Sequence, residues 1–418
     1  MAEKFDEFSI RFVENLYDQM YSNGSEFKTL MSKNEAVKMI KLNKHSDLFD
    51  LKKYFEEVDG QIRLTETDER GNTYYHTSSC LGTFLLTMNA LKDKNPKNKD
   101  GMTPLHFAAF NGYFEICNLI IENVKDKNPR ANNRVTPLHY AVKNGQLSIC
   151  ELITKHVQDQ NPSDEDGTTP LHMAVIEGHF DICQLLLQNT KNRNPRDNKG
   201  RTPLHLAAMD GKFQIFELIA KGVKNLNPRA DNFWTPLHLA AEGSHLKICK
   251  LILKHISDKN PRDDTGLTPL HVAALYGNVS VFEVFYVKDK NPAANNGTTP
   301  LHLAAQNGHL DVFLWISGKI KEINPKNFEG CTPLHLAAQH GYLQMCREII
   351  ERVADKNPKD QLGNTPLHFA AAVGRIGVCE LILKNVDERN PKNNQGKTPL
   401  DVADGHKNLH RLFNKPKL

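Results

Sequence analysis

The tripeptide Thr-Pro-Leu recurs along the chain at a nearly constant spacing. Every step between copies is 33 residues except one of 31, and the copies begin at Thr103, Thr136, Thr169, Thr202, Thr235, Thr268, Thr299, Thr332, Thr365 and Thr398. A unit this short cannot bury its apolar face alone, so successive units must stack on one another. The chain is therefore predicted to fold as a solenoid of small units and not around one globular core.

The residues within each copy predict how one unit folds. Pro203 sits at a first helical position, where no intrahelical hydrogen bond is lost, and Thr202 before it is a natural N-cap. Gly211 ends this helix, and a second helix with a buried apolar face is typical of segments such as residues 178–187. An Asn-Pro pair, as at Asn194, then turns the chain out of helix. Each unit is thus predicted to be a helix, a second helix and a projecting hairpin.

The segment Gly200-Arg-Thr-Pro-Leu-His-Leu-Ala-Ala-Met-Asp-Gly211 resembles the ankyrin-repeat consensus nearly residue for residue. The resemblance covers roughly residues 64–418, including a decayed copy that begins at Gly71. It implies an all-α ankyrin-repeat solenoid of about 11 repeats. It also implies a chain that binds a protein partner and does not catalyse a reaction.

Two segments are expected at the domain level. Residues 64–418 form the repeat array with a C-terminal capping repeat, and residues 1–63 form a helical N-terminal cap that includes a degenerate repeat over residues 33–63. A helix pair is predicted within residues 35–58, and its second helix includes Phe55. One helical face near the start is apolar, with Phe5, Phe8, Phe12, Leu16 and Met20. In the alternative hypothesis residues 1–63 carry an effector or oligomerisation function, and the array is their targeting arm.

The unit that begins at Thr268 departs from the common spacing. Its second helix, over residues 279–287, has lost two residues before Asn291. A shorter helix changes the local twist, so we expect an irregularity in the superhelix at this unit.

Composition and motifs exclude several classes of protein. No apolar run approaches the ~20 residues that span a bilayer, and the first residues are acidic where a signal peptide is basic. The formal net charge of +4 is too small to indicate a nucleic-acid partner. None of the patterns GxSxG, HExxH, GxxxxGK and GxGxxG occurs. We expect a monomeric cytoplasmic or nuclear protein that is not secreted, is not an enzyme and needs no cofactor.

Histidine and cysteine both recur once per unit. The repeated histidines, from His76 to His368, lie about one helix spacing apart, too far to share a zinc ion. Each is predicted to hydrogen-bond to its Thr-Pro turn and to the adjoining unit. One second-helix position holds Cys in some units and Phe in others, so it is predicted to be apolar and buried. The cysteines at this position are predicted to be free thiols: Cys117, Cys150, Cys183, Cys249, Cys346 and Cys379.

A basic ladder follows the Asn-Pro pairs. It consists of Lys97, Arg130, Arg196, Arg229, Arg262, Lys326, Lys359 and Lys392. Four residues before the ladder position runs an acidic row of Asp93, Asp126, Asp159, Asp258, Asp289 and Asp355. The favoured interpretation is that the two rows pair at the surface. In the alternative, the ladder binds nucleic acid or anionic lipid, which would show a steep dependence on salt.

Large apolar residues occupy positions that vary between units. They are Phe110, Ile176, Met209, Leu275 and Tyr276 on first helices, Trp234 just before its Thr, and Phe233 in place of the hairpin Gly. Stacking does not require variable positions to be apolar. We therefore predict a partner-binding groove on the concave face and the hairpin tips, in the first two-thirds of the array. Packing between units is the alternative.

Overall fold

The structure is a computed structural model that describes residues 55–58, 61–64, 67, 69–77, 84, 93–403 and 407–413. The chain divides into two compact units, residues 1–198 and residues 199–418. The apolar helix predicted near the start of the chain lies outside the described residues. The boundary predicted between residues 63 and 64 stays a prediction.

The first described elements are two short antiparallel strands, β1 (Phe55–Val58) and β2 (Gln61–Leu64). The prediction that Phe55 belongs to a helix is wrong, because Phe55 begins β1 and pairs with Leu64. The sequence between the strands reads Asp59-Gly60, which is a strong signal for a two-residue hairpin. That local signal outweighs the helical spacing of the apolar residues before it.

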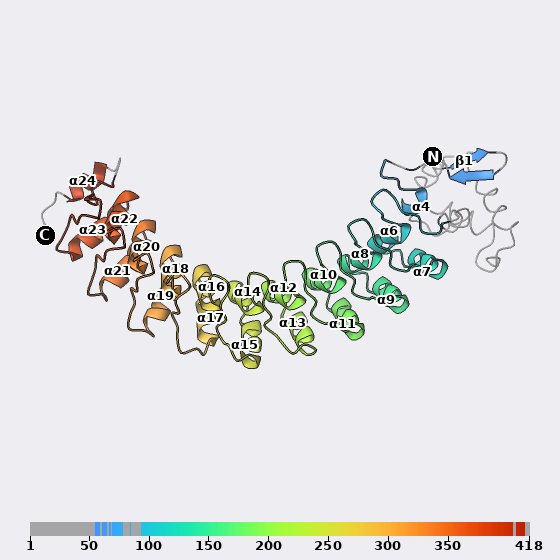
Figure 1. Ribbon diagram of the computed structural model, residues 1–418, viewed down its shortest axis with the longest axis horizontal. Helices are drawn as coiled ribbons and strands as arrows, with labels where there is room; N and C mark the ends of the chain where they lie inside the picture. The colour runs from blue at the N-terminus through green and yellow to red at the C-terminus, as the bar shows by residue number, and fades with distance from the viewer. Residues whose placement is uncertain are drawn as a thin grey trace, which may run out of the picture. The chain divides into compact units, whose positions relative to one another are not determined.

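In the first unit, helices follow the hairpin as pairs. Within this unit the first helices lie side by side in one layer and the second helices in another (Figure 1). The helices are α4 (Tyr74–Thr77), α6 (Pro104–Asn111), α7 (Phe114–Asn123), α8 (Pro137–Lys143), α9 (Leu147–His156), α10 (Pro170–Glu177) and α11 (Phe180–Asn189).

The second unit repeats the same pairing. Its first helices are α12 (Pro203–Met209), α14 (Pro236–Glu242), α16 (Pro269–Tyr276), α18 (Pro300–Asn307), α20 (Pro333–His340) and α22 (Pro366–Ala372). Its second helices are α13 (Phe213–Ala220), α15 (Leu246–His255), α17 (Val279–Val284), α19 (Leu310–Ser317), α21 (Leu343–Ile350) and α23 (Ile376–Asn385). The final helix, α24 (Lys407–Phe413), packs against α23.

These elements confirm the all-α repeat of two helices and a projecting loop. Each Thr-Pro from Thr103 to Thr365 starts a first helix, as at Thr136, which has the extended backbone of an N-cap. At Thr398 the Thr-Pro begins a turn instead. Gly112 ends α6 with φ of 80°, a left-handed conformation that costs Gly little. The shortening expected after Thr268 is also present, because α17 has only 6 residues where α15 has 10. The change in twist expected there stays a prediction.

The core of each unit is built between neighbouring helix pairs. The Leu of every Thr-Pro-Leu from Leu105 to Leu367 is buried, for example Leu138 and Leu237. The repeated second-helix cysteines are buried free thiols, in line with Phe216 and its equivalents, so the predicted apolar role of this row is confirmed. Burial raises the pKa of the Cys117 thiol to about 12. These thiols are therefore protonated at neutral pH and act as small apolar side chains.

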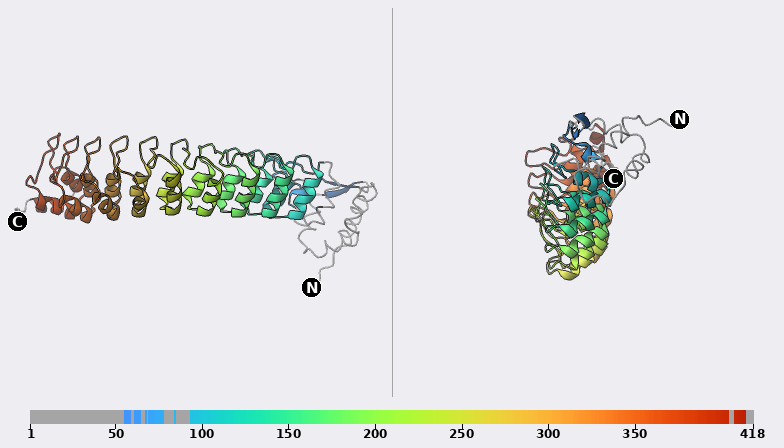
Figure 2. Two further views of the ribbon diagram at one scale, coloured as in Figure 1. Left: turned by 90° about the horizontal axis from the view of Figure 1, so that it is seen from below. Right: turned by 90° about the vertical axis from the view of Figure 1, so that its right-hand side faces the viewer.

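The loops between helix pairs project from one side of the helices within each unit (Figure 2). Neighbouring loop tips are joined by main-chain hydrogen bonds, such as the Asn132 amide to the Asp100 carbonyl at 2.9 Å and the Gln361 amide to the Glu329 carbonyl at 2.9 Å. The tips therefore carry their side chains on a connected backbone and not on independent loops.

Candidate functional site

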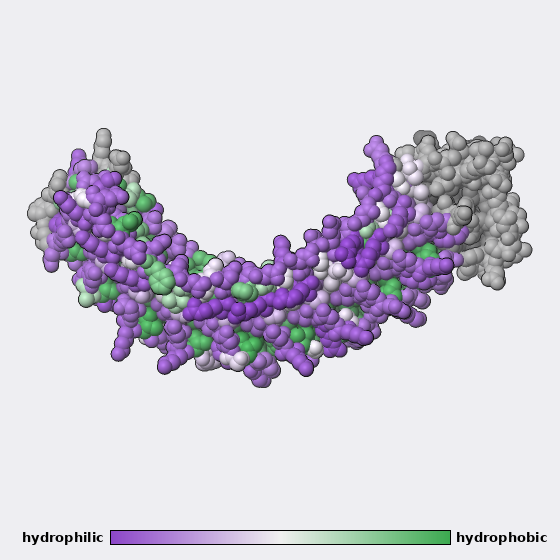
Figure 3. Space-filling view, viewed as in Figure 1, coloured by the Kyte–Doolittle hydropathy of each residue, from purple (hydrophilic) through white to green (hydrophobic). Residues whose placement is uncertain are grey.

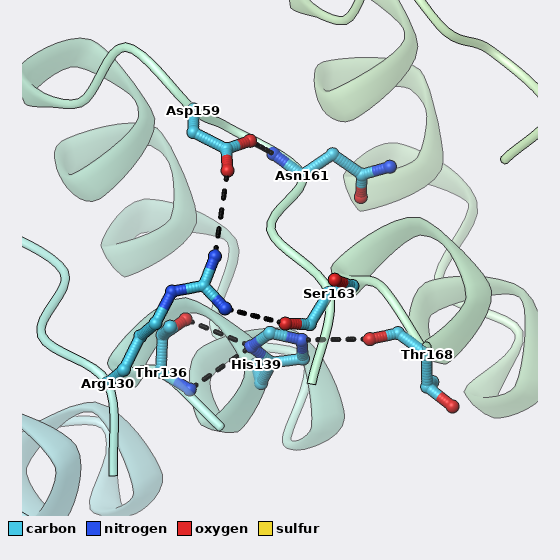
Figure 4. A network of polar contacts seen from close by, with 7 residues as sticks. All are labelled: Arg130, Thr136, His139, Asp159, Asn161, Ser163 and Thr168. Atoms are coloured by element: carbon cyan, nitrogen blue, oxygen red, sulfur yellow. Dashed lines mark hydrogen bonds and ion pairs between the residues drawn. The ribbon is translucent and has the colours of Figure 1, made fainter. Parts of the chain in front are cut away.

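The repeated histidine bridges two neighbouring repeats. His139 Nδ1 accepts from the Thr136 amide at 3.2 Å and from its hydroxyl at 2.9 Å, and Nε2 donates to the Thr168 carbonyl at 3.3 Å (Figure 4). Since Nδ1 accepts a main-chain N–H, the ring is the neutral Nε2–H tautomer. The same bonds are made by His76, His106, His238, His271, His302, His335 and His368. The predicted structural role of the histidine row is confirmed.

Burial makes these imidazoles poor bases. The pKa of His139 is lowered to about 4, mainly because the charged ring would lose its hydration, and His106, His238, His271, His302 and His335 show the same value. Both ring nitrogens are already bonded to the protein. The row therefore holds repeats together as neutral hydrogen-bonding groups.

The basic ladder also connects repeats. Arg130 Nη1 donates to the Ser163 carbonyl at 2.8 Å, and Ser163 occupies the ladder position of the next repeat (Figure 4). The equivalent bond, at 2.7–3.1 Å, joins Lys97 to Arg130, Arg262 to Ala293, Lys326 to Lys359, and Lys359 to Lys392. At the remaining positions Arg196 and Lys392 are exposed, and the Arg229 guanidinium lies 5.4 Å from the ring centre of Phe233.

The acidic row caps the turn that precedes the ladder. Asp159 accepts the Asn161 amide at 3.2 Å and lies 3.9 Å from Arg130 (Figure 4). The same amide bond, at 2.9–3.1 Å, is made by Asp93, Asp126, Asp258, Asp289 and Asp355. At the positions just described, both rows therefore form hydrogen bonds to the main chain. Ion pairs between the basic ladder and the acidic row are a minor part of their interactions.

In the first unit the predicted apolar positions lie on the exposed side of the first helices. Phe110 on α6 is 45% exposed and packs edge to face on Tyr140 of α8, with ring centres 5.7 Å apart. The Tyr140 hydroxyl reaches Met102 Sδ at 3.9 Å. Ile176 on α10 is 44% exposed. The structure thus brings Phe110, Tyr140 and Met102 together, and of these Phe110 was predicted from the sequence as a partner-binding residue.

In the second unit the equivalent side chains lie at helix ends whose main-chain carbonyls accept hydrogen bonds from the next repeat. Met209 and Tyr276 are 42% and 49% exposed, and Leu275 is half-buried. The carbonyls of Met209 and Leu275 accept from the imidazoles of His245 and His309, at 3.1 Å and 3.0 Å. These side chains are therefore presented on fixed helix ends.

Trp234 and Phe233 are neighbours in sequence with different surroundings. The Trp234 indole is half-buried, its Nε1 donates to Asp263 Oδ2 at 3.1 Å, and it stacks on His238. Trp234 thus serves packing between repeats, which was the alternative to partner binding. Phe233 is 44% exposed, and Arg229 is the cation over its ring.

Phe233 also adopts a backbone conformation that disfavours it. Its φ is 61°, whereas the Gly at the same position of most other repeats has φ between 70° and 81°. Left-handed backbone costs a residue with a Cβ about 1–2 kcal/mol, and aromatic side chains rarely adopt it. Such strain persists where a side chain is kept for a reason other than local stability. Arg134 occupies the same position in its repeat with φ of 62°.

A substitution series at residue 233 separates backbone strain from side-chain contacts. We expect Phe233→Ala to be less stable than Phe233→Gly by about 1 kcal/mol, because only Ala retains the left-handed penalty. Urea unfolding followed by circular dichroism measures the difference. Equal stability of the two variants would show that the loop is not strained.

The three most exposed large apolar side chains of the described residues were missed from the sequence. Phe328 and Leu362 lie on neighbouring loop tips and are 68% and 64% exposed, and Tyr286 after α17 is 91% exposed. Phe328 and Leu362 could have been found from the sequence, because the equivalent loop-tip positions of the other repeats hold polar residues. The face seen in Figure 3 is mostly hydrophilic, with separate apolar patches over each unit.

A family model matches most of the chain. This model, described as "Ankyrin repeats (3 copies)", matches residues 33–133, 74–164, 138–227, 190–263, 220–293, 237–327, 281–360 and 334–415. The first of these segments begins where the degenerate repeat was predicted to begin. No curated protein matches the chain. Within the described part of the chain, no helix combines the length and the apolar character needed to cross a bilayer.

Proposed function

The chain belongs to the ankyrin-repeat family, and we propose that it is a scaffold or adaptor that binds a partner protein through the exposed side of its first helices and its loop tips. Ankyrin repeats are generally protein–protein interaction modules, and proteins built from them are typically non-catalytic. The proposed partner-binding residues are Phe110, Ile176, Met209, Phe233, Leu275 and Tyr276.

One observation carries the proposal. Phe110, Ile176 and Met209 occupy the same first-helix position, and each is between 42% and 45% exposed. Other repeats place Lys143 or Glu242 at this position and still form the same helix pair. Since stacking does not need an apolar side chain there, exposed apolar side chains on fixed helix ends are suited to a partner that buries them.

The direct test replaces the three apolar residues by the residue that the chain itself uses elsewhere. Gln306 and Gln339 occupy this position in later repeats. We expect the variant Phe110→Gln, Ile176→Gln, Met209→Gln to keep its helicity and melting temperature but to lose the partners that wild type retains in affinity capture with mass spectrometry. Lys143→Gln, at the same position, is the matched control and should retain them.

Two outcomes would count against this surface. If the triple variant unfolds, these side chains serve packing, as Trp234 does. If it folds and retains every partner, binding occurs elsewhere in the chain, and residues 1–63 are the next candidate. Separate expression of residues 1–63 and 64–418 then shows which segment retains the partners.

The proposal extends to compartment and assembly. The buried cysteine row is made of free thiols, which fits a reducing compartment, so we propose a monomer in the cytoplasm or nucleus. We do not favour nucleic acid or lipid binding through the basic ladder. Lys97, Arg130, Arg262, Lys326 and Lys359 already donate to carbonyl oxygens of the next repeat.

A further inference from the structure

Helix α15 carries an unusual row of charge on its outer side. Lys247, Lys250 and Lys254 are all exposed, while Ile248, Cys249, Ile252 and Leu253 on the opposite side are buried. The lysines are spaced three and four residues apart, so they lie along one helix face. We call these three residues the lysine stripe.

The equivalent positions of another second helix hold an ion pair. On α23, Glu380 and Lys384 stand where α15 has Lys250 and Lys254, and their charged groups are 3.3 Å apart. Helix α13 also has an acid, Glu217, at the position of Lys250. In α15 the acid is replaced by a third lysine. Like charges three or four residues apart destabilise a helix by a few tenths of a kcal/mol.

Local stability accounts for two of the three lysines. Lys247 Nζ lies over the Phe213 ring, 5.9 Å from its centre, which is a favourable cation–π contact. Lys254 lies in the last turn of α15, where a cation is favoured by the helix dipole. Lys250 lies in the first half of the helix and gains nothing from the dipole. A row of like charges lowers the stability of the helix, so stability is not the reason for the whole row. The stripe is therefore suited to bind an external anion.

The lysines of the stripe form no ion pair in the described part of the chain, although Glu217 on α13 and Glu283 on α17 hold the position of Lys250 on the two neighbouring helices. Across the described residues, no carboxylate lies within ion-pair distance of Lys250 or Lys254, nor of the exposed Lys221 and Lys224 at the end of neighbouring α13. Helix α17, on the other side of α15, is followed by Tyr286, which is 91% exposed. The basic area therefore consists of the stripe itself with Lys221 and Lys224, and an exposed tyrosine follows the neighbouring helix.

The arrangement of these side chains favours one kind of polyanionic partner over the others. A folded acidic protein would need a desolvated apolar anchor at the centre of contact, where α15 presents only lysine. A single nucleic-acid strand would stack successive bases on several ring faces, whereas the Phe213 ring is covered by Lys247 at 5.9 Å and Tyr286 is one isolated exposed ring. An anionic bilayer needs neither a groove nor a free ring face. It attracts clustered lysines over an area, and tyrosine is enriched where proteins meet the head groups.

We propose that the outer face of α15 docks onto a membrane surface rich in anionic lipid, with Lys247, Lys250 and Lys254 as its main contacts. This surface lies on a second helix and is separate from the proposed partner-binding residues on the first helices and loop tips. The chain could therefore hold a protein partner while it rests on a membrane.

The test measures partition of the full chain onto vesicles by co-sedimentation. Vesicles of phosphatidylcholine with about 30% phosphatidylserine should bind wild type, pure phosphatidylcholine should not, and about 0.5 M salt should release it. Each lysine charge contributes about fivefold in partition. Lys250→Gln should therefore lower binding about fivefold, and Lys250→Glu, a change of two charges, about 25-fold.

Lys250→Glu also recreates the Glu–Lys pair of α23, so we expect a melting temperature equal to or above that of wild type. Lys384→Glu changes the net charge equally outside the stripe and should alter binding less than about twofold. The proposal fails if anionic vesicles bind no more than neutral ones, or if Lys250→Glu binds like wild type. It also fails if an acidic peptide or a thymidine oligonucleotide binds in a Lys250-dependent way while vesicles do not.

Discussion

Lowering the pH from 7 to about 4.5 is expected to unfold the helical repeats, at a pH where most surface carboxylates are still ionised. The cause is the row of buried neutral histidines. Each makes its two main-chain bonds only as the neutral tautomer, and burial lowers the pKa of six of them to about 4. Far-UV circular dichroism against pH, with return to pH 7, measures the transition.

The direction of this pH dependence follows from the pKa of histidine in the folded and in the unfolded chain. An unfolded histidine binds a proton near pH 6.5, and the folded one resists it until about pH 4. The stability contributed by the neutral form is therefore complete above pH 6.5 and is lost as pH falls from 6.5 to 4. The loss is about 3 kcal/mol for each such histidine. Two or three of them match the whole stability of a typical domain, about 5–15 kcal/mol.

The control replaces one histidine by a side chain with the same bonds and no titration. In His139→Gln, the amide oxygen can accept from Thr136 and the amide nitrogen can donate to the Thr168 carbonyl. We expect unfolding near pH 5 to take up about one proton fewer than in wild type. If helicity at pH 4.5 equals that at pH 7, or if His139→Gln leaves proton uptake unchanged, the histidine row does not set the acid stability.

The fold could be predicted because its signals are local and repeated. Thr-Pro at a helix start, Gly at its end and Asn-Pro after the second helix each act within a few residues, and they recur at one spacing. The same reasoning went wrong at Phe55, where apolar spacing suggested a helix but the Asp59-Gly60 pair favours a hairpin.

The surface could be predicted only in part. A side chain of one repeat often bonds to the next repeat, and the sequence of its own repeat does not reveal that partner. The basic ladder looked like a row of charges paired with aspartates, yet Arg130 reaches a carbonyl 33 residues further on. Tyr140 and Phe328 were missed for the related reason that exposure depends on which neighbour covers a position. The lysine stripe was visible in the sequence as three lysines, but its significance depends on the ion pair at the same place in α23.

Trp234 shows most clearly that an apolar residue at a variable position can serve packing. We expect Trp234→Ala to destabilise the chain by about 3 kcal/mol. The substitution removes the indole from His238 and leaves the Asp263 Oδ2 atom without its 3.1 Å donor. Asp263 is only 7% exposed, and its other oxygen accepts the Leu267 and Thr265 amides, so the carboxylate cannot move toward water without losing those bonds. Urea unfolding measures the loss.

Trp234→Phe divides this loss into its two causes. The ring can still stack on His238, but no N–H reaches Asp263, so we expect a loss of about 1.5 kcal/mol, the contribution of a hydrogen bond to a charged group. Partner capture by Trp234→Phe should equal that of wild type, because the proposed partner contacts Phe110, Ile176 and Met209. A Trp234→Ala variant as stable as wild type that loses its partners would instead place Trp234 in the binding surface. The half-buried indole bonded to Asp263 would then be a recognition contact held in place by the neighbouring repeat.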